Sequence, residues 1–167
     1  MPTVDYEDIE KLVQSINPDK SSGLDGISAR VLKDAFACLI PHLCDMFNKS
    51  IRQGIFPEAW AKATVVPIPK TGALDQISNW RPVSLLPTPG KMIEKIMHRH
   101  ITEIAGKLGL ISPKQFGFVK GKGTGDAVYE LINRLYESRD RSEVTCACYV
   151  DFSKAFDSIH HSLLLES

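Results

Sequence analysis

The chain has 167 residues, of which 43% are hydrophobic and 24% charged, close to the averages for globular proteins. These values exclude a disordered chain, a collagen-like repeat and a small disulfide scaffold, and the length fits one domain or a large part of one. Twenty basic and twenty acidic residues give a net charge of zero, but residues 88–122 hold seven basic and two acidic side chains. Such a basic band favours a polyanionic partner, although it is also typical of a solvated helix face.

The first 60 residues predict three helices. A helical repeat ends at Asn17-Pro18, a polar loop follows at 19–26, and Ser28 is a typical N-cap for the second helix. Pro41 suits the first turn of a third helix, and Gly54 suits its end. The first helix would bury one apolar stripe, formed by Ile9, Leu12, Val13 and Ile16.

Residues 63–70 and 80–86 predict a β-hairpin with a long tip at 71–79. Three prolines lie within these two runs, at positions 67, 69 and 82. Because proline donates no hydrogen bond to a ladder, such strands belong at an edge or in a hairpin.

The second half predicts a helix over 91–107, a loop rich in Gly and Lys over 112–125, and a helix over 127–139. We expect a buried strand over 144–151, with Cys146 and Cys148 toward the core, and a further helix from Phe156 onward. The long helix would turn its apolar face inward, through Ile93, Ile96, Met97, Ile101 and Ile104. This order of elements predicts an α+β fold.

No secretory signal opens the sequence, and no apolar run approaches the ~20 residues that span a bilayer. We therefore expect an intracellular protein of the cytoplasm or nucleus, with four free cysteines and no membrane segment.

Asp151 stands where the predicted strand ends. The carboxyl end of a buried strand is a common place for a metal ligand. An aspartate there also often ends a strand and caps a turn, so this position alone leaves both interpretations open.

The residues around Asp151 belong to a longer pattern. Tyr149-Val-Asp-Phe-Ser-Lys-Ala-Phe-Asp-Ser-Ile-His-His161 resembles the D-x-x-K-A-F-D-x-[IV]-x-H motif of reverse transcriptases, above all those of LINE-type (non-LTR) retrotransposons and the related group II intron proteins. Five further segments resemble family motifs in the same order, at 19–27, 54–70, 79–86, 91–94 and 115–118. The resemblance covers the chain from about residue 5 to its end.

The resemblance implies a partial right-hand polymerase: helix-rich fingers with a β-hairpin over 1–142, and the first strand and helix of the palm over 143–167. The family consists of RNA-directed DNA polymerases, which transfer nucleotides with Mg²⁺, an RNA template, a DNA primer and deoxynucleoside triphosphates. Two metal ions there clamp the attacking and leaving oxygens. The remainder of the polymerase polypeptide would be a necessary partner.

By the same resemblance, Asp151 maps onto the first metal-binding catalytic carboxylate, and the Phe152 carbonyl would help to hold one ion. Phe156 maps onto the aromatic gate that excludes a 2′-hydroxyl, although it could simply be a core residue under the next helix. Arg81 maps onto the arginine that grips the triphosphate, and Lys70 on the opposite strand would add a second cation.

The basic band would lie along the template backbone, where contacts with phosphates are independent of sequence. The residues expected there are Lys91, Lys95, Arg99, Lys114, Gln115, Lys120 and Lys122.

The chain departs from the family pattern in two respects. Val119 and Lys120 follow Gly117-Phe118, where the family has an arginine, and no [FY]-A-D-D motif occurs. That motif supplies the second pair of metal carboxylates, so we expect a fragment or degenerate copy that is inactive alone. Two alternatives stay open: a non-enzymatic nucleic-acid-binding remnant and a helical protein-interaction module.

Overall fold

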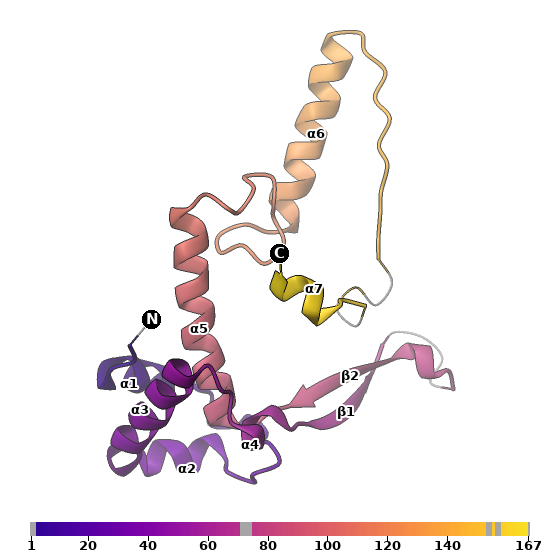
Figure 1. Cartoon of the computed structure of the whole chain (residues 1–167). Coiled ribbons are helices and arrows are strands. Elements are labelled where there is room, and N and C mark those ends of the chain that lie inside the picture. The colour runs from indigo at the N-terminus through magenta and orange to yellow at the C-terminus, as the bar shows by residue number, and fades with distance from the viewer. Residues whose placement is uncertain (1–2, 71–74, 153–154, 156–157, 167) are drawn as a thin grey trace. The chain divides into compact units, whose positions relative to one another are not determined.

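The computed structural model describes residues 3–70, 75–152, 155 and 158–166 (Figure 1). The chain divides into two compact units, residues 1–110 and 111–167. The expected α+β class is confirmed, since the described part combines helices with one two-stranded antiparallel sheet. None of its helices is both long and apolar enough to cross a bilayer.

The first unit contains most of the regular structure. Its helices are α1 (Tyr6–Ser15), α2 (Ala29–Asp34), α3 (Phe36–Gln53), α4 (Glu58–Ala61) and α5 (Thr88–Lys107). Its strands are β1 (Thr64–Pro69) and β2 (Trp80–Leu85), with a short 3₁₀ turn, η1 (Ile77–Asn79), just before β2.

Local capping explains where several of these helices begin and end. Asp5 caps α1 by accepting a 2.8 Å hydrogen bond from the Asp8 N–H, and Ser28 caps α2 by accepting one of 3.2 Å from Val31. Gly54 ends α3 in the left-handed region at φ 66°, as predicted. Pro41 lies inside α3, because that helix already begins at Phe36, with only Ala35 between it and the end of α2. The prediction that Pro41 occupies a first turn was therefore wrong.

The core of the first unit forms where α1, α3, α4 and α5 meet. Phe47 and Ile9 are fully buried, and the Phe47 ring meets the Trp60 ring edge-on at a centroid distance of 5.6 Å. The predicted inward face of α5 is correct for Ile93, Ile96 and the partly buried Met97, but not for Ile101 and Ile104, which are exposed. The other members of this core are Val4, Val13, Leu43, Ile51 and Met92.

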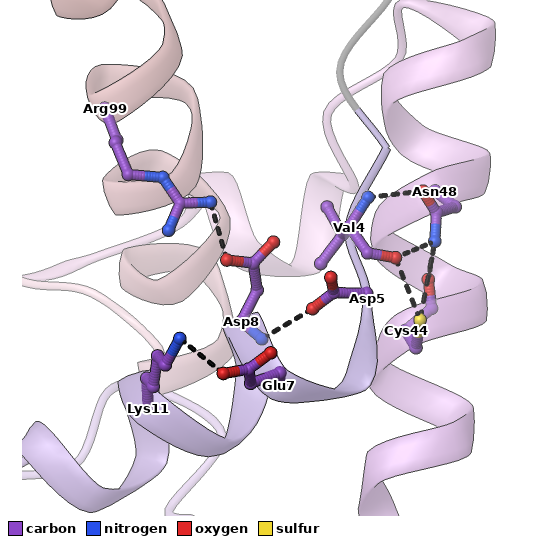
Figure 2. A network of polar contacts seen from close by, with 8 residues as sticks. All are labelled: Val4, Asp5, Glu7, Asp8, Lys11, Cys44, Asn48 and Arg99. Atoms are coloured by element: carbon purple, nitrogen blue, oxygen red, sulfur yellow. Dashed lines mark hydrogen bonds and ion pairs between the residues drawn. The ribbon is translucent and has the colours of Figure 1, made fainter.

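A network of polar contacts fixes the N-terminal segment to α3 (Figure 2). The Asn48 side chain accepts a 3.0 Å hydrogen bond from the Val4 N–H and donates one of 2.8 Å to the Val4 carbonyl. The Cys44 thiol donates to the same carbonyl at 3.2 Å. On the other side of α1, Asp8 pairs with Arg99 of α5 at 2.7 Å. These contacts join α1 to both long helices of the unit.

The predicted hairpin is confirmed: β1 and β2 pair antiparallel, with Val66 opposite Val83 and Ile68 opposite Arg81. Every residue of β1 is exposed, so the hairpin buries no face of that strand. Residues 71–74 of its tip lie outside the described residues. The prolines are therefore accommodated in a ladder of only two strands.

The second unit contains α6 (Thr124–Asp140) and α7 (His161–Glu166). Helix α6 begins where the Asp126 carboxylate accepts a 2.7 Å hydrogen bond from the Gly123 N–H. The apolar repeat of this segment, Val128, Leu131, Ile132 and Leu135, predicts an inward face, but no residue described in α6 is buried.

The predicted strand over 144–151 is absent from the described structure. Residues 143–152 are extended and exposed, with Val144 fully exposed and Cys146 and Cys148 also at the surface. A strand requires a partner for its N–H and C=O groups, and no neighbouring strand is described beside this segment. The helix expected from Phe156 begins at His161 in the described part of the chain.

Candidate nucleotide and nucleic-acid interface

The hairpin brings Lys70 and Arg81 to one face. Arg81 lies directly opposite Ile68, and Lys70 follows Ile68 by two residues, so side-chain alternation places both cations on the same side. The ladder continues past β1, because the Lys70 N–H donates a 2.7 Å hydrogen bond to the Asn79 carbonyl. Both side chains are exposed. Two cations on the same face of one hairpin can contact adjacent phosphate oxygens of one ligand.

The predicted template residues of α5 divide into two groups. Lys91 and Lys95, one helical turn apart, line a cavity of about 160 Å³ together with Lys20 from the loop after α1. Arg99, a further turn along, forms the 2.7 Å ion pair with Asp8. Arg99 therefore has a structural role in joining α1 to α5, in addition to any contact with nucleic acid.

Lys20 was not among the predicted site residues. It belongs to the segment 19–27, which was singled out only as a family motif. Its position at the cavity depends on how this loop meets the start of α5, which no local sequence pattern specifies. The sequence alone therefore does not show that Lys20 lies beside Lys91 and Lys95.

The basic loop of the second unit is organised by one of its own lysines. The Lys122 ammonium donates hydrogen bonds to the carbonyls of Pro113 and Gln115, and it lies 5.1 Å from the centroid of the Phe116 ring. The Gln115 amide donates to the Gly117 carbonyl at 3.4 Å. Lys122 and Gln115 therefore shape the loop, as an alternative to the predicted direct contact with template.

Lys114 and Lys120 lie in the same loop and are exposed. Of the four predicted template residues of this unit, these two present their charge to solvent. A pair of exposed lysines on a loop can contact a nucleic-acid backbone without reading its sequence.

Asp151 lies in the exposed extended segment, with Phe152 beside it. Within the ranges that the structure describes, no three His, Cys, Asp or Glu side chains gather in a way that could hold a metal ion. One exposed carboxylate does not fit the several oxygen ligands that Mg²⁺ takes in polymerase sites. The described residues by themselves therefore do not form a magnesium site. Phe156 lies outside the described residues.

Comparison with known proteins identifies the family. Residues 68–167 match the family described as reverse transcriptase (RNA-dependent DNA polymerase). The chain belongs to this family. This agrees with the motif order, which runs from the loop at 19–27 to the segment around Asp151.

The relatives of this reverse transcriptase chain come from non-LTR retrotransposons, as predicted. It is 32% identical over 97% of its length to the RNA-directed DNA polymerase from mobile element jockey of Drosophila funebris. It is 30% identical over 98% of its length to the putative 115 kDa protein in type-1 retrotransposable element R1DM of Drosophila melanogaster. It is also 26% identical over 96% of its length to the probable RNA-directed DNA polymerase from transposon X-element of the same fly. The chain covers 18%, 16% and 18% of these proteins, less than a fifth of each.

Proposed function

We propose that this chain forms the fingers region, 1–142, and the start of the palm, 143–167, of an RNA-directed DNA polymerase of a non-LTR retrotransposon. In this role the fingers hold an incoming deoxynucleoside triphosphate and contact the RNA template and DNA primer. The reaction is the Mg²⁺-dependent nucleotidyl transfer of the full-length family, with Asp151 as one metal ligand. As for other retrotransposon proteins, we propose an intracellular site of action, in the cytoplasm or nucleus.

The observation that carries this proposal is the shared face of Lys70 and Arg81. The guanidinium of Arg81 offers a planar fork of donors that suits two phosphate oxygens at once, and a lysine adds a mobile point charge. Both cations lie at the surface of a two-stranded ribbon, so an incoming triphosphate can reach them without displacing core residues.

The chain by itself should not polymerise. Asp151 alone does not assemble a two-metal site, and the sequence lacks the second acidic pair of the family motif. We therefore propose that catalysis requires the rest of the polymerase polypeptide, and that this chain contributes binding of nucleotide and nucleic acid.

The experiment measures binding of a deoxynucleoside triphosphate to the 167-residue chain in the presence of Mg²⁺, by isothermal titration. Arg81→Gln should weaken binding about tenfold, since a hydrogen bond to a charged group contributes about 1.5–3 kcal/mol. Arg52→Gln is the matched control, because Arg52 is an exposed arginine in the last turn of α3 and makes the same change in charge. Equal affinities for the two variants and the wild type would contradict the assignment of Arg81.

A primer-extension assay tests the second part of the proposal. We expect no extension of an RNA-templated DNA primer by this chain. Extension that is lost in Asp151→Ala would show that carboxylates outside the expected motif complete the metal site. Absence of both triphosphate and RNA binding would leave the helical interaction module as the better account.

A further inference from the structure

Three lysines from two separate segments surround one small hollow of the first unit. Lys20 comes from the loop after α1, and Lys91 and Lys95 come from the first two turns of α5. We call this hollow the lysine cavity. Among the described residues that line it there is no acidic side chain, and none of the three lysines forms an ion pair in the described part of the chain.

Neighbouring cations have a different arrangement. Arg30 pairs with Asp19 at 3.3 Å beside the same loop, and Arg99 pairs with Asp8 on the same helix as Lys91 and Lys95. The acids closest in sequence to Lys20 and Lys95 are therefore engaged elsewhere or do not line the cavity. Three like charges around one space repel one another, and an anion between them would remove this repulsion.

The size of the lysine cavity restricts its ligand. Its volume is about 160 Å³, below the ~300–1,000 Å³ of pockets that enclose a whole small molecule. Since only ~10–15 Å³ of such volume is needed to hold one water molecule, the cavity is large enough for a single phosphate group. A base or a complete nucleoside would have to remain outside.

The start of α5 contributes to the same wall. Thr88, the first residue of this 20-residue helix, lines the cavity. The first turn of a helix carries the positive end of its dipole, which favours a nearby anion. The field of the helix therefore has the same sign as that of the three ammonium groups.

The loop that carries Lys20 is held in place by the backbone. A Cβ atom at Gly23 would lie 2.4 Å from the Pro87 nitrogen and 2.6 Å from the Leu86 carbonyl carbon, so only glycine permits this contact. The Lys20 N–H also donates a 3.3 Å hydrogen bond to the Asn17 carbonyl. The backbone of this loop is thereby held against the residues that precede α5, so the wall of the cavity that carries Lys20 is present without a ligand.

We propose that the lysine cavity binds one phosphate group, through Lys20, Lys91, Lys95 and the first turn of α5. A nucleic-acid backbone and a free phosphate compound share this chemistry. The inference builds on the proposed function in expecting the backbone as the source, with the adjoining nucleoside outside the cavity. It assigns Lys20 to binding, and it makes Lys91 and Lys95 parts of one site rather than separate charges along a helix.

The test uses three variants of the 167-residue chain. The triple variant carries Lys20→Gln, Lys91→Gln and Lys95→Gln together, a single variant carries Lys20→Gln, and a control carries Lys107→Gln. Lys107 is the control, because it is exposed on the same helix and lies sixteen residues beyond Lys91, about 24 Å at 1.5 Å per residue. One arm titrates a fluorescein-labelled single-stranded RNA 20-mer by fluorescence anisotropy at several KCl concentrations. The other arm follows backbone amide NMR shifts during addition of inorganic pyrophosphate.

The triple variant should bind RNA about tenfold more weakly, and its log–log salt dependence should fall by about 0.7, the value for one phosphate of a single strand. Lys20→Gln alone should weaken RNA binding in the same direction, and Lys107→Gln should remain within about twofold of the wild type. Circular dichroism spectra that match the wild type would show that the variants are folded.

The outcomes separate this inference from the proposed function. RNA binding by the wild type with no loss in the triple variant would overturn the cavity and leave the function standing. Pyrophosphate shifts at 20–23 and 88–91 that vanish in the triple variant, without RNA binding, would support the cavity for a free phosphate compound and contradict the proposed function. No response in either arm would overturn the inference.

Discussion

The two units of the chain use apolar side chains in opposite ways. In the first unit, α1, α3, α4 and α5 enclose Phe47, Ile9 and Met92 almost completely. In the second unit, the 17-residue helix α6 also carries several apolar side chains, but none that the structure describes there is buried. Apolar periodicity therefore predicts that a helix has an apolar face. It does not predict whether the same unit contains another element that packs against this face.

Replacing one side chain in each unit tests this difference with the largest expected effect. Phe47→Ala removes the centre of the first core and should lower the free energy of unfolding by about 3–5 kcal/mol. Leu135→Ala, on the exposed face of α6, should change it by less than about 0.5 kcal/mol. Urea unfolding followed by tryptophan fluorescence and by circular dichroism measures both. Losses of similar size would show that α6 is packed in solution.

A smaller effect is expected from the contact between the 19–26 loop and the start of α5. Gly23→Ala places a methyl group within 2.6 Å of the backbone at Leu86 and Pro87, and should destabilise the first unit by about 1–3 kcal/mol. Gly117→Ala is the control in the second unit, because a Cβ there meets nothing within 4 Å. Thermal unfolding compares the two variants. An unchanged midpoint for Gly23→Ala would mean that the loop moves away at little cost.

The hydrogen bonds between Asn48 and the backbone of Val4 should contribute about 1 kcal/mol to the free energy of unfolding. Asn48→Ala leaves the Val4 N–H without its hydrogen-bond acceptor in a partly buried position. Asn133→Ala in α6 is the matched control, at a position where no core depends on the amide. Hydrogen exchange should show faster exchange of α1 amides in the first variant only. Equal exchange in both would indicate that Cys44 holds the segment alone.

The cysteines allow the smallest effect to be measured, because burial changes the rate at which a thiol is alkylated even where the stability of the chain is unchanged. Burial raises the pKa of the Cys44 thiol above its ordinary value, and the Asn48 side chain partly offsets this by hydrogen bonding. Because the thiolate is the reactive form, Cys44 should be alkylated more slowly than the exposed Cys146 and Cys148 at any pH below that value. Mass spectrometry after timed treatment with iodoacetamide measures the rates. Equal rates would show that α3 opens readily beside Val4.

The sign of the pH effect on stability follows from the same pKa. The folded chain favours the neutral form of the Cys44 thiol. The contribution of this thiol to the free energy of unfolding is therefore complete below its ordinary pKa and is lost as pH rises through the raised pKa. Unfolding of Cys44→Ser should therefore show a weaker loss of stability than the wild type in the alkaline range.

Local sequence signals predicted the first unit well. Ser28 and Gly54 mark helix ends through their own hydrogen bonding and backbone conformation, and the prolines at 67, 69 and 82 restrict their segments to an edge or a hairpin. Each of these signals acts over a few residues. They therefore do not depend on what lies elsewhere in the chain.

The errors arose where structure depends on distant partners. Residues 144–151 have the composition of a buried strand, yet a strand forms only beside another, and the structure describes none there. Ile101 and Ile104 continue the apolar face of α5, but the packing against the core ends at Met97, so both are exposed. The same holds for the site residues. Arg81 could be predicted from its local motif, whereas Lys20 was identified only from the contact between its loop and the start of α5.

The amide of Asn48 imitates a neighbouring strand, because it both accepts from and donates to the backbone of Val4, 44 residues earlier. The segment at Val4 therefore cannot settle until α3 has formed. On a ribosome, the beginning of this unit would have to wait for the synthesis of more than forty further residues. Closing so long a loop costs entropy before the contact repays it, so α1 should be among the last parts of the first unit to acquire protection during folding.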